Sequence, residues 1–141
     1  MRTAADAIEH LRAQLCSHAG PVRIVGGNSK SFYGREVEGV PLATTDLRGV
    51  VAYEPSELVI TALAGTPLGE IEAVLAERGQ MLAFEPPHFG DTATLGGTIA
   101  CGFSGPRRPY AGAARDFGVR CLTAAGESAL RRSGDEERRR V

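Results

Sequence analysis

Apolar and polar residues alternate along the chain in short blocks that predict both helices and strands. Residues 4–17 place apolar side chains at helical spacing, with charged residues largely off that face, which predicts an amphipathic helix. Gly20-Pro21 is expected to end this helix. Its apolar positions are Ala5, Ile8, Leu11 and Leu15.

Four short apolar runs predict β-strands. The run at residues 22–25 is β-branched, is short enough for a buried strand, and stops at two glycines. A second strand is expected near residues 40–43. The runs at residues 49–53 and 57–64 predict a hairpin or adjacent strands of one sheet.

A second helix is predicted over residues 67–78. Thr66 is a good N-cap, Pro67 suits the first helical position, and Glu70 lies in the first turn. Arg78-Gly79 is typical of a helix C-terminus. The apolar face of this helix is Leu68, Ile71, Val74 and Leu75. Helices and strands together predict an α+β fold.

The loop after the first strand, Gly26-Gly27-Asn28-Ser29-Lys30, carries residues suited to a phosphate group. Paired glycines allow φ > 0, so that consecutive backbone N–H groups can form an anion-binding nest. Asn28 and Ser29 add hydrogen-bond donors, and Lys30, the only lysine of the chain, adds a compact positive charge. A plain strand-to-turn connection has the same composition, and this alternative stays open.

A second glycine-rich stretch covers residues 92–116. Glycine at this density is costly inside a helix or strand and indicates backbone that lies close to another backbone or to a ligand. One interpretation is a surface loop with solvated arginines. The other is a second wall of the site that begins at Gly26.

Length, charge and cysteine content exclude several classes of function. The 141 residues have the size of one domain, and a net charge of −1 gives no electrostatic case for a nucleic-acid partner or an acidic membrane. Cys16, Cys101 and Cys121 are widely spaced, which favours reduced thiols in a cytoplasmic protein over a disulfide framework or a zinc site. We expect no signal peptide, because the N-terminus lacks a basic region followed by an apolar run, and no membrane span, because no run approaches about 20 apolar residues.

Several sequence blocks, taken in order, resemble the FAD-binding subunits of bacterial glycolate oxidases, within the vanillyl-alcohol-oxidase-like, PCMH-type superfamily of flavoproteins. The resemblance covers nearly everything from Val22 to Glu127. The blocks are Gly26-Gly27-Asn28-Ser29-Lys30, Tyr53-Glu54-Pro55-Ser56-Glu57-Leu58-Val59-Ile60-Thr61, Gly79-Gln80-Met81-Leu82, Glu85-Pro86-Pro87-His88, Gly102-Phe103-Ser104-Gly105-Pro106-Arg107-Arg108-Pro109 and Arg115-Asp116-Phe117.

The resemblance implies a PCMH-type FAD-binding domain over residues 1–127, an α+β fold in two lobes that is incomplete at its C-terminus. It implies that the FAD pyrophosphate lies in the loop from Gly26 to Lys30. Some relatives attach FAD through a histidine in this loop, whereas Lys30, Ser31 and Phe32 offer none, so FAD is expected to be non-covalent. The remaining residues expected to approach FAD are Pro86, Thr94, Gly96, Gly97, Ala100, Gly102, Ser104, Gly105 and Tyr110.

The same resemblance implies a function as the FAD-binding component of a complex that oxidises a small 2-hydroxy acid such as glycolate. The implied partners are a second flavoprotein subunit and an iron–sulfur subunit, and the implied location is the cytoplasm, with peripheral attachment to the inner membrane through these partners. No catalytic residue or metal ligand is assigned, and His88 is expected to be a loop histidine. The alternatives are a stand-alone FAD- or nucleotide-binding module without catalysis and an inactive truncated remnant.

Two segments depart from the resembling family. Arg115-Asp116-Phe117-Gly118 is two residues shorter than the family's Arg-Asp-Phe-Val-Leu-Gly. Residues 128–141 are charged and aperiodic, which predicts a disordered tail. Synonymous codons for this tail exist that, shifted by one base, encode the family's Leu-Arg-Phe-Gly-Gly-Gln-Val-Met-Lys-Asn-Val-Ala-Gly. We therefore interpret the tail as out-of-frame translation, which the nucleotide sequence beyond the Arg120 codon tests.

Overall fold

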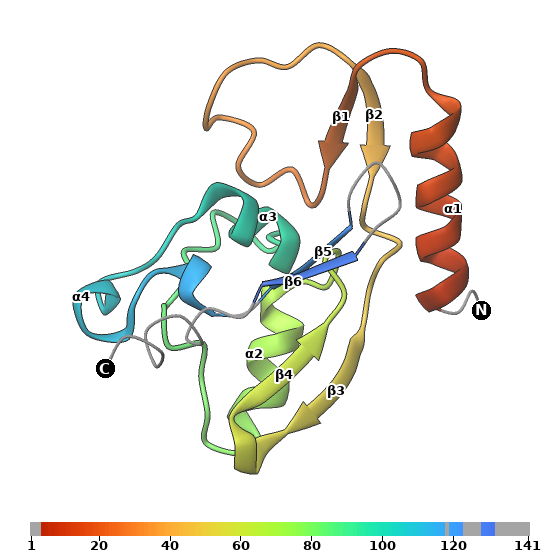
Figure 1. The fold of residues 1–141 in the computed structure, drawn as a ribbon. Coiled ribbons are helices and arrows are strands. Elements are labelled where there is room, and N and C mark those ends of the chain that lie inside the picture. Colours follow the sequence, from red (N-terminus) through yellow and green to blue (C-terminus); the bar gives the residue numbers. More distant parts are fainter. Residues whose placement is uncertain (1–3, 118, 123–127, 132–141) are drawn as a thin grey trace, which may run out of the picture.

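The computed structural model describes residues 4–117, 119–122 and 128–131, in which short helices and strands follow one another (Figure 1). This mixed content confirms the expected α+β class. The elements are α1 (Ala4–Ser17), β1 (Val22–Val25), β2 (Val40–Ala43), β3 (Val50–Glu54), a 3-10 turn (Pro55–Glu57), β4 (Val59–Ala62), α2 (Leu68–Ala76), α3 (Leu95–Cys101), α4 (Arg108–Ala111), a second 3-10 turn (Ala114–Asp116), β5 (Val119–Leu122) and β6 (Ser128–Arg131).

The strands form pairs of two different kinds. β1 and β2 are parallel, with Val22 opposite Val40. β3 and β4 form the expected antiparallel hairpin, with an irregular register near the start of β3. β5 and β6 are antiparallel, so the segment predicted to be irregular from residue 128 begins with a strand. Residue 118 and residues 132–141 lie outside the described residues.

Residues 22–25 form the predicted strand, but the prediction that this strand is buried is wrong. Ile24 is 69% exposed, and the ends of β1 are only half-buried. The helix α1 packs against β2 instead, where Ala7 and Leu11 meet Leu42 and Leu47 in a small apolar core. The β1–β2 pair therefore presents the side chain of Ile24 to solvent.

A second group of buried apolar side chains lies along α2. Leu68, Ile71 and Leu75 are buried as the helical spacing predicts. The prediction that Thr66 caps this helix is wrong, because Pro67 occupies the N-cap position. The Thr66 hydroxyl instead accepts a hydrogen bond from Gly49 N (2.9 Å) and donates one to Gly49 O (3.2 Å), which ties the start of α2 to β3.

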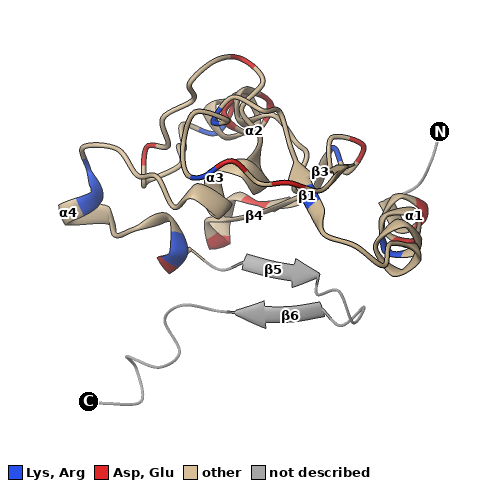
Figure 2. Cartoon of the chain, turned by 90° about the horizontal axis from the view of Figure 1, so that it is seen from above, with Lys and Arg blue, Asp and Glu red and all other residues tan. Residues whose placement is uncertain are grey.

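The helix α2 ends at Ala76, two residues before the predicted end, and Gly79 follows in the turn as predicted. Gly79 adopts φ = +64°, and its N–H donates to Ala76 O at 3.0 Å, as expected for a glycine that ends a helix. Acidic and basic positions are interspersed over the described part of the chain (Figure 2). None of the helices within residues 4–117 is long and apolar enough to cross a membrane.

Candidate cofactor-binding site

The loop after β1 and the segment before α3 lie against each other. A Cβ atom added to Gly26 would lie 2.8 Å from Thr94 Oγ1, and one added to Gly27 would overlap the carbonyl oxygen of Thr92. Gly27 therefore requires glycine because its backbone lies close to the backbone of Thr92, whereas Gly26 lies against the side chain of Thr94. This contact brings the two glycine-rich stretches together.

The glycines of this loop do not adopt the conformation that the sequence suggested. Neither Gly26 nor Gly27 has a positive φ, whereas Asn28 turns the chain with φ = +56°. Asparagine tolerates this left-handed conformation better than most residues do. The expectation of a nest at paired left-handed glycines is thus wrong, and the glycines serve close packing instead.

The second glycine stretch contains α3, which glycine content did not favour. Thr94 is its N-cap and accepts a hydrogen bond from Gly97 N at 3.3 Å. Gly96 N donates to Ala64 O at 2.7 Å, and a Cβ at Gly96 would lie 2.9 Å from Ala64 Cβ. The helix forms here because its cap and the neighbouring backbone compensate for poor intrinsic helix propensity.

Further along this stretch, Gly105 packs on the segment that contains Pro86. A Cβ at Gly105 would overlap Glu85 O, and Gly105 N donates to Phe84 O at 2.8 Å. Pro86 is itself buried. The glycine stretch thus contacts two other backbones, one at each end of α3.

Lys30 is buried, with 9% of its surface exposed. Its Nζ donates to Ser29 Oγ at 3.5 Å and lies 6.0 Å from the ring centroid of Phe89. Among the described residues, no carboxylate lies within ion-pair distance of this ammonium. Burial lowers the pKa of Lys30, and the negative charge of a Cys101 thiolate opposes that shift. A buried lysine that has no carboxylate partner among the described residues favours an anionic ligand.

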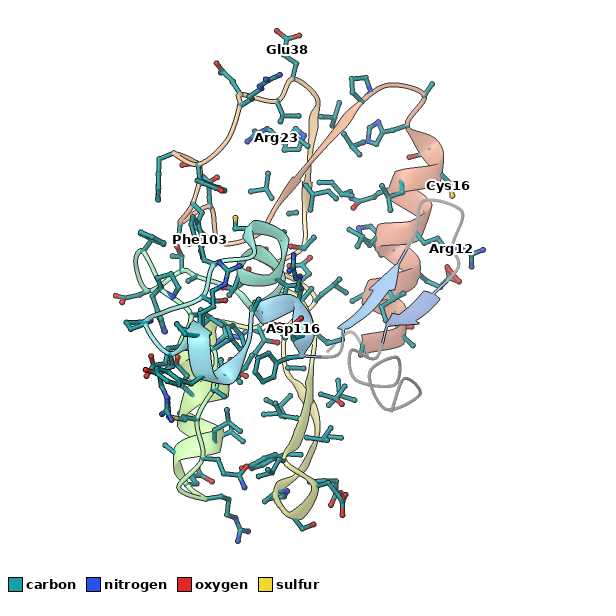
Figure 3. The ribbon with its side chains drawn as sticks, turned by 60° about the vertical axis from the view of Figure 1, so that its left-hand side comes forward. Arg12, Cys16, Arg23, Glu38, Phe103 and Asp116 are labelled. Carbon is teal, nitrogen blue, oxygen red and sulfur yellow. The ribbon has the colours of Figure 1, made fainter. Side chains whose placement is uncertain are left out.

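Four aromatic rings gather beside Lys30 from three separate segments. Phe89 lies 5.2 Å from Phe32 and 5.5 Å from Phe103, and Tyr33 lies 4.6 Å from Phe103, all between ring centroids. Figure 3 labels Phe103, beside the loop that follows β1. The sequence indicates no role for Phe89 or Phe103, because their proximity depends on contacts between distant segments.

Other predicted residues occupy less enclosed positions. Tyr110 is 92% exposed on α4, which lies at the opposite side of the molecule from α1 (Figure 1). Ala100 is exposed, and Gly102 ends α3 with φ = +66°. Ser104 Oγ accepts a hydrogen bond from Ala114 N at 3.0 Å, which joins the glycine stretch to the second 3-10 turn.

His88 and Thr98 are two further polar residues of this region. His88 Nε2 lies 3.0 Å from Glu72 Oε1, so its ring contacts the surface of α2. Thr98 Oγ1 is fully buried and has no hydrogen-bond partner within the described structure. The described residues contain no cluster of three or more His, Cys, Asp or Glu side chains suited to a metal ion.

Comparisons with known proteins place this geometry in a family. The family model described as "FAD binding domain" matches residues 2–129. The chain is 54% identical over 116 residues to the glycolate oxidase subunit GlcE of Escherichia coli K12, a match that covers 81% of this chain and 33% of that protein. The chain therefore spans about a third of the length of this relative.

Solved structures show the same fold. Two crystal forms of an alkyldihydroxyacetonephosphate synthase each match with a TM-score of 0.67 and 20% sequence identity. Each match covers 92% of this chain, and 25% and 27% of the respective solved chains. At this identity the likeness supports the fold alone.

Proposed function

Because the chain belongs to the FAD binding domain family, we propose that it holds FAD non-covalently with the pyrophosphate in the loop from Gly26 to Lys30. FAD is the cofactor of this family. The second glycine stretch forms the opposite wall of this site. Asn28 and Ser29 supply hydrogen-bond donors beside the phosphates.

The observation that carries the proposal is the buried side chain of Lys30, whose ammonium has no carboxylate partner among the described residues. A diphosphate supplies the anionic oxygens that no described carboxylate supplies. Charge-assisted hydrogen bonds to such an ammonium are stronger than neutral ones, and the surrounding low dielectric strengthens them further. The residues present therefore fit the phosphate part of FAD.

The two glycine stretches lie against each other, which supports the proposal that both contact FAD. Gly26 and Gly27 lie against Thr92 and Thr94, so a ligand on the loop also reaches the start of α3. We assign the remaining contacts to residues of the second stretch and to the proline beside it. These residues are Pro86, Thr94, Gly96, Gly97, Ala100, Gly102, Ser104, Gly105 and Tyr110.

At the level of the whole protein, we propose that the chain is the front part of the FAD-binding subunit of a complex that oxidises glycolate or a similar small 2-hydroxy acid. A second flavoprotein subunit and an iron–sulfur subunit are the proposed partners, with peripheral attachment at the inner membrane. When bound, the flavin supplies the hydride-transfer chemistry. The residues described above bind and orient it.

A second candidate is a module without catalysis or an inactive remnant of such a subunit. The observation that favours it is the exposure of apolar side chains on both the β1–β2 pair and the β3–β4 hairpin. Two-stranded sheets need a further layer or further strands for independent stability. The apolar side chains exposed on these strands are Ile24, Val40, Val51 and Val59.

Titration of the purified chain with FAD tests the proposal. Lys30→Met is expected to weaken FAD binding about 10- to 150-fold, because a hydrogen bond to a charged group contributes about 1.5–3 kcal/mol. Arg23→Met removes the same charge from an exposed position on β1 and is expected to leave the affinity within about twofold. Equal losses in the two variants would contradict a specific role of Lys30.

Acid precipitation is expected to release all flavin into the supernatant, since the attachment is non-covalent.

A further inference from the structure

We propose that Phe89 is a positioning residue, whose ring holds the Lys30 side chain and joins the glycine loop to the end of α3. This inference rests on the proposed function, because the position of Lys30 matters through the anion that it binds. Phe89 was not among the residues expected to approach FAD.

The position of the Phe89 ring carries the inference. Its centroid lies 5.2 Å from that of Phe32, in an edge-to-face arrangement with an interplanar angle of 66°. It also lies 5.5 Å from Phe103 and 6.0 Å from Lys30 Nζ. Within the described cluster, Phe89 is the ring that contacts both neighbouring segments and the ammonium.

An aromatic face is a suitable partner for a cation that must also bind a phosphate. The negative face of the ring attracts the Lys30 ammonium without neutralising it. A carboxylate at the same place would compete with the anionic ligand. Phe89 therefore restricts the rotamers of Lys30 while its charge stays available, which lowers the ordering cost of binding.

The backbone at Phe89 is held in an unfavourable conformation. Its φ is +53°, a left-handed value at which the Cβ atom of a bulky residue crowds the following carbonyl. Strained backbone of this kind persists only where its surroundings hold it in place, and it gathers at ligand-binding sites. Asn28, in the glycine loop itself, is another non-glycine residue with a positive φ.

Leu58 offers a matched control for this strain. It has φ = +56° and is 77% exposed between the 3-10 turn and β4. Leu58→Gly relieves a similar strain away from Lys30, and we expect it to raise the Tm without altering FAD affinity. A change in FAD affinity in this variant would show that backbone strain alone affects the site.

A double-mutant cycle tests the proposal. Phe89→Leu removes the aromatic face, and we expect it to raise the Kd for FAD about 3- to 10-fold, whereas Phe89→Tyr keeps the ring and stays within about twofold. In a Lys30→Met background, Phe89→Leu is expected to have no further effect, because it acts through Lys30. The same loss in both backgrounds would overturn the proposal and indicate a general structural role.

A second readout does not depend on FAD. Lys30 is the only lysine, so its side-chain Hε and Cε signals are unambiguous in an NMR spectrum. We expect Phe89→Leu to move these signals of the FAD-free protein toward free-lysine values, and Phe89→Tyr to retain them. Unchanged Lys30 signals in Phe89→Leu would overturn the inference even if FAD binds. Absence of FAD binding in the unmodified chain, with Lys30 signals that shift as expected, would contradict only the proposed function.

Discussion

Among the single residues, Lys30 combines a buried side chain with a positive charge. The side chain is buried, its ammonium has no carboxylate partner among the described residues, and the burial lowers the pKa of Lys30. Its neighbours Phe89 and Cys101 are distant in the sequence. The sequence indicated Lys30 as a phosphate-binding residue. The burial of Lys30 could not be predicted, because it depends on these distant neighbours.

The titration of Lys30 predicts how FAD affinity depends on pH. The bound pyrophosphate favours the charged amine, so FAD affinity is expected to fall as pH rises through the lowered pKa of Lys30, by up to about tenfold per pH unit. Lys30→Arg keeps its charge throughout this range, so the Lys30-dependent fall is expected to be absent. Fluorescence titrations with FAD at several pH values measure the affinities of the unmodified protein and of Lys30→Arg. An identical fall in the two proteins would indicate that another group titrates.

FAD affinity falls with rising pH, whereas the contribution of Lys30 to the stability of the FAD-free protein should rise. The folded protein releases the Lys30 proton at a lower pH than the unfolded chain does. The unfolded state therefore binds more protons between the lowered pKa and the ordinary value of 10.5, and the contribution of Lys30 to the free energy of unfolding rises with pH in this window. Below the lowered pKa the burial penalty is fully present.

The unpaired hydroxyl of Thr98 leads to a prediction about stability. Because Thr98 Oγ1 is buried without a partner within the described structure, Thr98→Val removes an unsatisfied polar group at nearly constant shape. We expect the Tm to rise by about 2–6 °C. Differential scanning calorimetry of the FAD-free protein measures this. A fall in Tm would show that the hydroxyl has a partner, such as an internal water molecule.

At the scale of elements, α3 shows where local patterns fail. Its two glycines have low helix propensity, yet Thr94 caps the first turn and Gly96 donates to Ala64 O. The extent of α1, the β3–β4 hairpin and the turn after α2 followed their patterns because neighbouring residues determine them. The cap of α2 did not, since the Thr66 hydroxyl binds the distant Gly49. The apolar face predicted for α1 is wrong in part, because the helix buries Ala7 and Leu11 and leaves Ala5 and Ile8 exposed.

Close packing of the glycine loop on the segment before α3 can be tested with alanine. Gly27→Ala is expected to lower the free energy of unfolding by about 1–3 kcal/mol, because its Cβ would overlap Thr92 O and the backbones must move apart. Gly69→Ala is the matched control, since Gly69 lies in α2 with nothing within 4 Å of an added Cβ. This control should increase stability by about 0.5–1 kcal/mol. Urea denaturation compares the two variants, and equal effects would contradict the packing.

At the scale of the whole molecule, the described elements surround the candidate site incompletely. The loop after β1 and the segment before α3 meet, whereas Tyr110 on α4 stays exposed. Both the β1–β2 pair and the β3–β4 hairpin also present apolar side chains to solvent. Ordered sequence blocks indicated the FAD family, and the family match over residues 2–129 confirms it. The exposure of β1 could not be predicted, because it depends on which faces α1 covers.

The measurement that tests the central claim most directly is a map of backbone amide chemical shifts during titration of the ¹⁵N-labelled chain with FAD. We expect the largest shifts at residues 26–30 and 94–97, where the pyrophosphate meets the two glycine stretches. Inorganic pyrophosphate, which has no rings, is expected to reproduce the shifts at residues 26–30. Saturable FAD binding with shifts centred elsewhere would contradict the placement of the pyrophosphate in this loop.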